Sequence, residues 1–366
     1  MRSSLSIAAV LALTASSAFA VGPCSCQTDL NVDGVTDASD LAIVLGAWGG
    51  TGDADFDANG TIDAADLAIL LGAWGPCAPP PNDDCGNAIM IPAFGPLTEF
   101  CNAAATMSPV AFPTCEGVTT PVGKDVWYRY VTPYSGVLQV HTCNSTFDTV
   151  LAVYGSIIQG ACACPSNGIN FATVRGCSDD SPSCGVGSFV EIPVGADECL
   201  TFRIAGYNYS GNVSEGYGEL FINPIKTGDR CDIAHELGNA FNVTVPGTNA
   251  GDTSVQADPS SCANNDIYDE WYRYTMPCEG TLTISTCDAG TDYDTTLAVY
   301  SDCGGANSEI ACNDDSTEPG CQIAGLNRKS LLVINAAGGE TVYIRVSGFN
   351  GSTGNFVLNL SAHCNG

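Results

Sequence analysis

Two kinds of hydrophobic spacing divide the chain. Between residues 40 and 75 the apolar side chains recur at intervals of three and four, which predicts amphipathic helices. After Pro79 they alternate with polar side chains in short runs bounded by Gly, Asn, Asp, Ser and Pro, which predicts β-strands joined by turns. We therefore expect a small helical segment followed by a long all-β region.

The two expected helices are copies of one another. Each ends in Leu-Gly-Ala-Trp-Gly and places apolar residues at i, i+3, i+4 and i+7, on one helical face. These residues are Leu41, Val44, Leu45 and Trp48 in the first helix and Leu67, Leu70, Leu71 and Trp74 in the second. Each acidic loop is followed by a helix, but neither loop is directly preceded by one, as it would be in a complete EF-hand.

The β region also repeats itself. Asp125-Val-Trp-Tyr-Arg-Tyr returns as Asp269-Glu-Trp-Tyr-Arg-Tyr, and three further blocks recur in the same order with a period near 140 residues. Such a period is too long for a solenoid repeat, so we interpret it as a duplicated domain. Short strands must bury one face against a second sheet, which predicts a two-sheet sandwich in each copy. The clearest strands are 137–141, 189–192, 200–205 and 219–222, then 281–285, 331–334, 342–346 and 356–360.

The acidic loops before the helices have the spacing of calcium sites. An EF-hand-type loop has oxygen ligands at positions 1, 3 and 5, glycine at 6, a backbone carbonyl at 7 and an acid at 12. Both loops comply, with Gly34 and Gly60 at position 6. The expected calcium ligands, with the acid at position 9 included, are Asp29, Asn31, Asp33, Val35, Asp37 and Asp40, then Asp55, Asp57, Asn59, Thr61, Asp63 and Asp66.

The charge of this segment is an independent reason to expect metal. Between Cys24 and Cys77 there are nine aspartates and no Lys, Arg or His, so the metal-free segment folds against its own repulsion. We therefore expect binding of two Ca²⁺ ions and folding to be one event. The alternative is an acidic, solvated linker, which has no use for glycine at position 6 in both loops.

The loops and helices resemble the dockerin domain of secreted polysaccharide-degrading systems, in which two loop–helix repeats face each other in pseudo-twofold symmetry. The resemblance covers roughly residues 29–74. It implies calcium binding and docking to a cohesin-like or cell-surface protein. Loop positions 10 and 11, often Ser-Thr in well-known dockerins, are Ala38-Ser39 and Ala64-Ala65 here. This departure bears on cohesin recognition and leaves the calcium ligands intact.

The β repeats resemble the bacterial pre-peptidase C-terminal family, jelly-roll-like sandwiches appended to secreted enzymes and related to collagen-binding modules. The shared blocks are Trp-Tyr-Arg-Tyr, Asp-Thr-x-Leu-Ala-Val-Tyr and Arg-x-x-Gly-aromatic-Asn, within residues 82–224 and 228–363. The collagen-binding relatives hold Ca²⁺ between the N-terminal segment and a loop. By that resemblance, further ions are expected at Asn82, Asp83, Asp148 and Asp180 in the first copy and at Asp229, Asp294 and Asp315 in the second.

The expected class is mainly β, two tandem jelly-roll-like β-sandwiches preceded by a small all-α dockerin or EF-hand-like calcium module. Arg2, an apolar run and Ala18-Phe19-Ala20 are typical of a secretory signal peptide cleaved after Ala20. The expected parts are a signal peptide at 1–20, the dockerin-like module at 21–77, a Pro-rich linker at 78–82, and sandwich repeats at 83–225 and 226–366.

Twenty cysteines fit an oxidising compartment, and their positions repeat between the copies. Sequence alone leaves the connectivity open. The pairs that the repeat suggests are Cys143 with Cys162 or Cys164, Cys287–Cys303, Cys177–Cys184, Cys312–Cys321, Cys85–Cys115 and Cys231–Cys262. Separately, Cys24 or Cys26 is expected to pair with Cys77 and join the ends of the calcium module.

Candidate catalytic residues are few. The three histidines offer no Ser-His-Asp or Cys-His arrangement, and His141 is replaced by Ser285 in the second copy. The acids Asp179-Asp180 and Asp314-Asp315 are candidates for glycoside hydrolysis. However, neighbours on extended backbone point to opposite sides, and both copies contain them. We assign no catalytic residue and expect a structural or calcium role.

The aromatic pairs Trp127-Tyr128 and Trp271-Tyr272 are expected to place one member in the core. Sugar stacking is the alternative for the other. The net charge of −29 argues against nucleic acid and anionic membranes as partners. No stretch after the signal peptide has the length and apolar character of a membrane span.

We therefore expect a secreted protein, extracellular or on the cell surface, that binds calcium and is not catalytic. Its dockerin-like module docks, and its sandwiches bind a polysaccharide, a matrix protein or another partner. The alternative is a secreted hydrolase that degrades polysaccharide or protein, which would take part in polysaccharide catabolism. An active site should show acids in one copy that the other lacks, and the sequence comparison reveals none.

Overall fold

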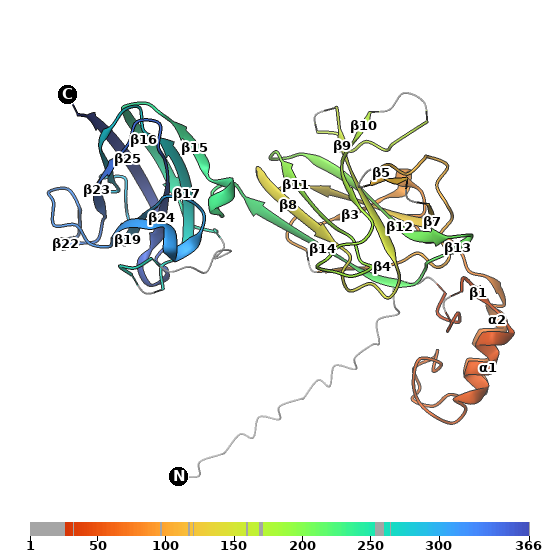
Figure 1. The fold of residues 1–366 in the computed structure, drawn as a ribbon. Coiled ribbons are helices and arrows are strands. Elements are labelled where there is room, and N and C mark those ends of the chain that lie inside the picture. Colours follow the sequence, from red (N-terminus) through yellow and green to blue (C-terminus); the bar gives the residue numbers. More distant parts are fainter. Residues whose placement is uncertain are drawn as a thin grey trace, which may run out of the picture.

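The computed structural model describes residues 26–365, except 32, 96, 116–117, 120, 159, 168–170, 253–259 and 264. The predicted signal peptide and Cys24 lie outside the described residues. Figure 1 shows a small helical module followed by two β-sandwiches, with β14 reaching from the first sandwich toward the second. The mainly β prediction with two sandwiches is confirmed.

The N-terminal module contains two short helices, α1 (Ala38–Gly46) and α2 (Ala64–Gly72). Its ends are held together by the antiparallel pair of β1 (Val35–Thr36) and β2 (Gly75–Pro76) and by the disulfide Cys26–Cys77. The core is small, with few large side chains, so the helices depend on caps and on the clasped ends. Its buried residues are Val44, Ala54, Phe56, Ile62 and Leu70.

The first sandwich packs a larger sheet against a four-stranded sheet. The larger sheet has the order β10 (Ala172–Ser178), β9 (Thr149–Ser156), β12 (Cys199–Tyr209), β7 (Val122–Val131) and β3 (Ile89–Ile91), with β13 (Asn212–Val213) paired to β12. The second sheet has the order β11 (Phe189–Val194), β8 (Gly136–His141), β14 (Tyr217–Lys226) and β4 (Thr98–Cys101). A short hairpin joins β5 (Thr114–Cys115) to β6 (Val118–Thr119).

The second sandwich repeats the order of these strands, except that β13 has no counterpart among its described residues. One sheet has the order β15 (His235–Gly238), β17 (Ile267–Thr275), β24 (Thr341–Gly348), β19 (Thr295–Tyr300) and β20 (Glu309–Asn313). The other has the order β16 (Asn242–Thr248), β25 (Asn355–Cys364), β18 (Gly280–Ser285) and β23 (Leu331–Ala336). The remaining short elements are the hairpin β21 (Gln322–Ile323) and β22 (Leu326–Asn327) and the 3₁₀ turns η1 (Cys85–Asn87), η2 (Cys231–Ile233), η3 (Gly305–Ser308) and η4 (Phe349–Gly351).

The central strands of each larger sheet are buried on both faces. β9 is buried over Thr149–Gly155, whereas β11 in the opposite sheet alternates between buried and exposed residues. Tyr128 faces the core between the sheets, and Trp127 faces a second apolar layer made by loops on the outer face. Both side chains are therefore buried, as are Trp271 and Tyr272 in the second copy.

A buried ion pair lies under each outer layer. Arg203 Nε donates to Asp125 Oδ2 at 2.6 Å, and its guanidinium packs over the ring of Trp127. In the second copy Arg345 bonds to Asp269 and also to Asp266, each at 3.0 Å. Breaking such a pair costs more than an exposed pair, because it leaves a buried charge without a partner.

The disulfides correct most of the suggested pairs. Cys85 joins Cys164 and Cys115 joins Cys177, which fastens loops over the outer layer, and Cys143 joins Cys184. The equivalent bonds recur in the second copy, as Cys231–Cys303, Cys262–Cys312 and Cys287–Cys321. The bonds Cys162–Cys199 and Cys278–Cys364 each occur in one copy. Of the suggested pairs, Cys26–Cys77 is confirmed. The others are wrong because the repeat identifies equivalent cysteines and leaves open which of them meet in space.

Candidate functional site

The two acidic loops of the N-terminal module have the same internal hydrogen bonds. In the first loop, Asp29 accepts from the N–H of Asp33 at 3.0 Å and of Gly34 at 2.7 Å. In the second loop, Asp55 accepts from Asn59 at 3.1 Å and from Gly60 at 2.8 Å. Both glycines have positive φ, +87° and +92°, which side chains with a Cβ rarely adopt. The glycine expected at position 6 is therefore explained by backbone geometry.

The acids at positions 9 and 12 form capping boxes at the helix starts. Asp37 is the N-cap of α1 and accepts from the Ser39 N–H, and Asp40 accepts in return from the Asp37 N–H. Asp63 and Asp66 repeat this arrangement in α2. The position-12 carboxylates of Asp40 and Asp66 are fully buried, and each accepts further hydrogen bonds from backbone N–H groups of its own loop. These acids thus have a structural role that does not depend on metal.

The pKa values of two loop acids, Asp66 and Asp29, reflect their burial and their hydrogen bonds to backbone N–H groups. Desolvation raises the pKa of Asp66, but the N–H groups of Asp63, Asp57 and Phe56 outweigh it and the pKa is lowered. In Asp29, desolvation outweighs the N–H groups of Gly34 and Asp33, and the pKa is raised. The position-12 acid of the second loop is therefore held in its charged form, the form that a cation requires.

The two loops gather their expected ligands to different extents. Carboxylate oxygens of Asp55, Asp57 and Asp66 lie within 4.8 Å of one another, an all-oxygen set of the kind that Ca²⁺ prefers. In the first loop, Asp29 instead groups with the sulfur atoms of Cys26 and Cys77, which are tied up in a disulfide. Of the described residues, those of the second loop therefore fit a calcium ion better.

The sandwiches contain two further acidic groups at equivalent places. Asp148, Asp179 and Asp180 meet in the first copy, and Asp294, Asp314 and Asp315 in the second. Burial, together with the neighbouring carboxylates of Asp315 and Asp294, raises the pKa of Asp314 to about 6. Asp148 Oδ1 is buried and accepts no hydrogen bond from any described residue. In the second group, Arg328 Nε lies 3.7 Å from Asp294 Oδ2, so the charge of that group is partly neutralised.

These groups correct part of the expectation for the sandwiches. Adjacent acids such as Asp179 and Asp180 reach the same group because β10 has already ended at Ser178 and the backbone turns. Asn82 and Asp83 do not join them: Asn82 donates to the Trp127 carbonyl, and Asp83 accepts from Thr106. Asp229 also lies outside its expected group. Asp179 and Asp314, which the sequence analysis gave a structural or calcium role but left out of the two expected ligand sets, belong to these groups.

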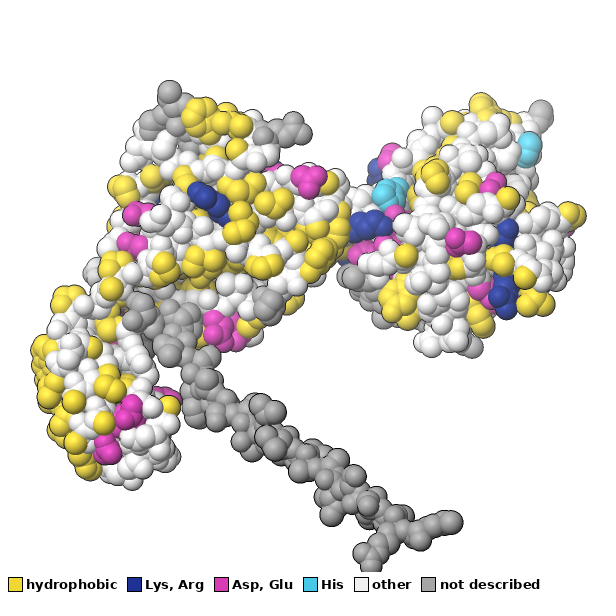
Figure 2. Space-filling view, turned by 180° about the vertical axis from the view of Figure 1, so that it is seen from behind, with side chains coloured by type: hydrophobic (Ala, Val, Ile, Leu, Met, Phe, Trp, Pro, Cys, Tyr) yellow, Lys and Arg dark blue, Asp and Glu magenta, His cyan; other side chains and the backbone are white. Residues whose placement is uncertain are grey.

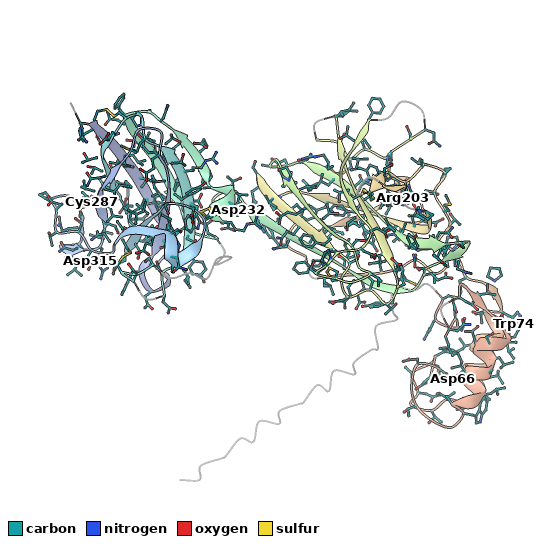
Figure 3. All side chains as sticks on the ribbon, in the orientation of Figure 1. Asp66, Trp74, Arg203, Asp232, Cys287 and Asp315 are labelled. Atoms are coloured by element: carbon teal, nitrogen blue, oxygen red, sulfur yellow. A yellow bond between two sulfur atoms is a disulfide. The ribbon has the colours of Figure 1, made fainter. Side chains whose placement is uncertain are left out.

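The N-terminal module exposes large apolar side chains. Of the predicted helical faces only Val44 and Leu70 are fully buried, whereas Trp48 and Trp74 are about half exposed, at 48% and 49%. Figure 2 shows apolar side chains along the outer edge of this module, and Figure 3 shows Trp74 on its outer rim. Ile43 and Ile69, which the sequence reading did not single out, are exposed as well. We use the name apolar face for the exposed large apolar side chains of the two helices and their ends, which are Ile43, Leu45, Trp48, Ile69, Leu71 and Trp74.

A family model described as galactose binding domain-like, with a name that marks it as T9SS-associated, matches residues 81–176 and 227–346, more than half of the chain. The chain belongs to this galactose-binding-domain-like family. The two matches fall on the two sandwiches, one on each copy. Together with nine disulfides among the described residues, this membership is typical of a secreted protein. No helix in the described part of the chain is long and apolar enough to cross a membrane.

Several solved structures are similar to this galactose-binding-domain-like chain. The pre-peptidase C-terminal domain of the Bacillus anthracis collagenase has 17% identity and a TM-score of 0.21, covering 36% of this chain and 94% of that one. An uncharacterised Burkholderia cenocepacia protein has 10% identity and a TM-score of 0.23, covering 71% and 79%. The human MASP-1/3 CUB1-EGF-CUB2 fragment has 6% identity and a TM-score of 0.19, covering 73% and 99%. No curated protein matches the sequence.

Proposed function

We propose that this protein is an extracellular, non-catalytic binding protein. Its N-terminal module docks onto a protein partner when its loops hold calcium, and its galactose-binding-domain-like sandwiches bind carbohydrate. The observation that carries the docking proposal is the apolar face. A small module that leaves two tryptophans half exposed, and repeats them by internal symmetry, has a surface typical of protein interaction sites.

The calcium proposal rests on the oxygen set of the two loops. Asp55, Asp57, Asn59, Asp66 and the Thr61 carbonyl would hold an ion in the second loop, and Asp29, Asn31, Asp33, Asp40 and the Val35 carbonyl in the first. A bound ion would neutralise carboxylates that now face one another. Further ions at the two acidic groups of the sandwiches are part of the same proposal. Because both sandwiches contain such a group, a structural or calcium role is favoured over catalysis.

The carbohydrate proposal rests on membership of the galactose-binding-domain-like family and on the secreted character of the chain. Its ligand class follows from the family name alone. The four aromatic residues that the sequence offered for sugar stacking are at most 4% exposed, so their rings are not open on the surface for a sugar to stack on.

The test uses the full mature chain with and without EDTA. Calorimetry should detect at least two calcium ions per chain. Capture from the producer's culture medium should retain a protein partner in calcium, lose it in EDTA, and lose it with the double variant Trp48→Ala/Trp74→Ala. Capture that is insensitive to both changes would contradict the docking proposal.

The carbohydrate proposal is tested on a panel of insoluble polysaccharides. Retention of the protein without release of soluble sugar is expected. Release of soluble oligosaccharides would support the hydrolase alternative instead, and no retention on any polymer would refute carbohydrate binding. Trp48→Ala/Trp74→Ala serves as the matched control here, because it should leave polysaccharide retention unchanged.

A further inference from the structure

The second sandwich has a cavity of about 540 Å³ between two edge strands of its opposite sheets, β15 and β16. This volume is within the range of small-molecule sites. Both polar and apolar side chains line the cavity, among them Lys226, His235, Glu270, Tyr272, Leu237 and Val245. Figure 2 shows basic, acidic and histidine side chains gathered on the second sandwich beside its junction with the first. Figure 3 places Asp232 on this side, and Cys287 and Asp315 on the opposite side.

Four ionisable side chains form one network at the cavity. Lys226 Nζ lies 2.7 Å from Asp252 Oδ1 and 3.0 Å from Glu270 Oε2, and Glu270 Oε1 lies 2.5 Å from His235 Nε2. Asp252 and Glu270 are each only 4% exposed. Burial, together with the Glu270 carboxylate, raises the pKa of Asp252 to about 8. The network is therefore a buried, charged structure that opens to solvent through His235 and Lys226.

The first sandwich provides a natural control for this network, because its corresponding positions are apolar. The register identifies them: Ile89 pairs in parallel with Tyr128 as His235 does with Tyr272. The correspondences are Ile89 for His235, Val126 for Glu270, Ala105 for Asp252 and Pro80 for Lys226. The first sandwich thus builds the same fold with no ionisable group at any of these places.

An exchange of aromatic rings accompanies this difference. In the first copy, Phe100 of edge strand β4 pairs with Gly218, where a Cβ would lie 2.2 Å from the ring. In the second copy the ring is Phe356 of inner strand β25, and it pairs with Gly247 of edge strand β16, where a Cβ would lie 2.4 Å from the ring. Each copy therefore has one phenylalanine at this pair of positions, but in the second copy the ring belongs to the inner strand and the edge strand has the glycine. Gly247 consequently lines the cavity.

Stability does not explain these four ionisable side chains. Replacing apolar core residues by buried ion pairs is usually neutral or unfavourable for folding, and the first sandwich shows that apolar residues suffice. Clusters of buried ionisable groups in a cleft are instead typical of functional sites. The expectation that neither copy has acids that the other lacks is therefore wrong: Glu270 and Asp252 occur in the second copy only. The signal was present in the sequence, one residue before the repeated tryptophan.

We propose that this cavity binds a single neutral sugar residue and that the first sandwich has no equivalent site. This inference rests on the proposed carbohydrate-binding function and locates it. Because Lys226 and His235 are both already bonded to Glu270, a charged ligand would have to break these pairs, whereas hydroxyl groups can add hydrogen bonds to them. The Tyr272 hydroxyl offers a further polar contact, and Leu237 and Val245 offer an apolar wall for the C–H face of a sugar ring.

The test titrates the full mature chain with methyl β-galactoside and, in parallel, methyl β-glucoside, while recording the NMR signals of its histidine rings. The chain has three histidines, so each can be followed separately. Saturable shifts of the His235 signals are expected, with those of His363 unmoved. Binding that leaves the His235 signals in place would overturn the proposal.

The decisive variant is His235→Ile/Glu270→Val, which installs the residues of the first copy. We expect glycoside affinity to fall at least tenfold, while the melting temperature of the second sandwich stays the same or rises. Val333→Thr, at an exposed position of edge strand β23, is the control and should bind as the wild type does. Unchanged affinity in the double variant would refute the site.

The failures of the two proposals can be told apart. Suppose that the wild type is retained on polysaccharide but binds neither glycoside, or that the double variant binds a glycoside as tightly as the wild type does. In either case this inference fails and the proposed function stands. If the glycoside shifts His235 but no polymer retains the protein, the site stands and polymer binding fails.

Discussion

This chain contains two duplications, and the copies differ from each other much less in one than in the other. The halves of the N-terminal module agree closely: the N-caps Asp37 and Asp63 share φ −141° and have ψ −158° and −159°. The two sandwiches share topology, three disulfides and a buried arginine, but they differ around one cavity. Positions that both copies keep are explained by folding. Positions that one copy has changed from apolar to charged need another explanation, and they coincide with the cavity.

Even the symmetric module has one difference imposed from outside. A Cβ on Gly34 would lie 2.8 Å from the Ala103 carbonyl of the first sandwich, whereas Gly60 has no neighbour within 4 Å. The first loop therefore packs against the sandwich, and the second loop is free to solvent on that side. Near-identical sequence does not guarantee identical surroundings.

The largest expected effect tests what the sandwiches share. Arg203→Met should destabilise the first sandwich by about 3–5 kcal/mol because it leaves Asp125 buried without its partner. Arg345→Met should cost at least as much, since two aspartates lose their partner. Calorimetry of the separate unfolding transitions measures both. The control Asp125→Leu/Arg203→Met should recover most of the loss, and a loss below 1 kcal/mol in either single variant would contradict the prediction.

The next effect tests the symmetry of the N-terminal module. Asp40→Ala and Asp66→Ala each remove a buried acceptor of several backbone N–H groups, at a cost of about 1–3 kcal/mol. Hydrogen exchange of the helix amides, measured in chelator so that the caps alone are tested, should show similar losses in α1 and α2. The Asn variants should lose less. A large difference between the two alanine variants would break the symmetry.

A smaller, pH-dependent effect tests the divergence of the sandwiches. The pKa of Asp252 is raised from 3.8 to about 8, so the folded chain binds a proton that the unfolded chain releases between these values. This contribution to stability is therefore lost as pH rises through that window. Asp252→Asn should melt at a higher temperature relative to wild type at pH 8 than at pH 5. Parallel melting profiles of the second sandwich would show that Asp252 does not titrate as expected.

The smallest effect concerns the apolar face. Trp48→Ala and Trp74→Ala should each change stability by no more than about 0.5 kcal/mol, because both side chains are half exposed. Denaturant titration in calcium measures this. Val44→Ala is the contrasting variant, since Val44 is fully buried and its truncation should cost clearly more. If the tryptophan variants unfold the module, the apolar face serves folding rather than docking.

Local sequence patterns accounted for much of the fold. The strands predicted at 137–141 and 281–285 are β8 and β18, and the helix starts follow from capping acids that act within a few residues. Contacts between residues far apart in the sequence were harder to predict from it. The repeat identified Cys177 and Cys312 as equivalents but paired them with sequence neighbours, whereas their partners, Cys115 and Cys262, lie 62 and 50 residues away.

The sequence by itself determined the duplications, the strand pattern and the acidic loops, because period, turn residues and ligand spacing are local properties. The tertiary structure alone decided which faces are covered: the outer loops bury Trp127 and Trp271, while Trp48 and Trp74 stay exposed. It also brought Lys226 to Asp252 and Glu270, from different segments of the chain, at the edge of one sandwich. The physical reason is that burial and charge pairing depend on neighbours supplied by distant segments, which no local pattern specifies.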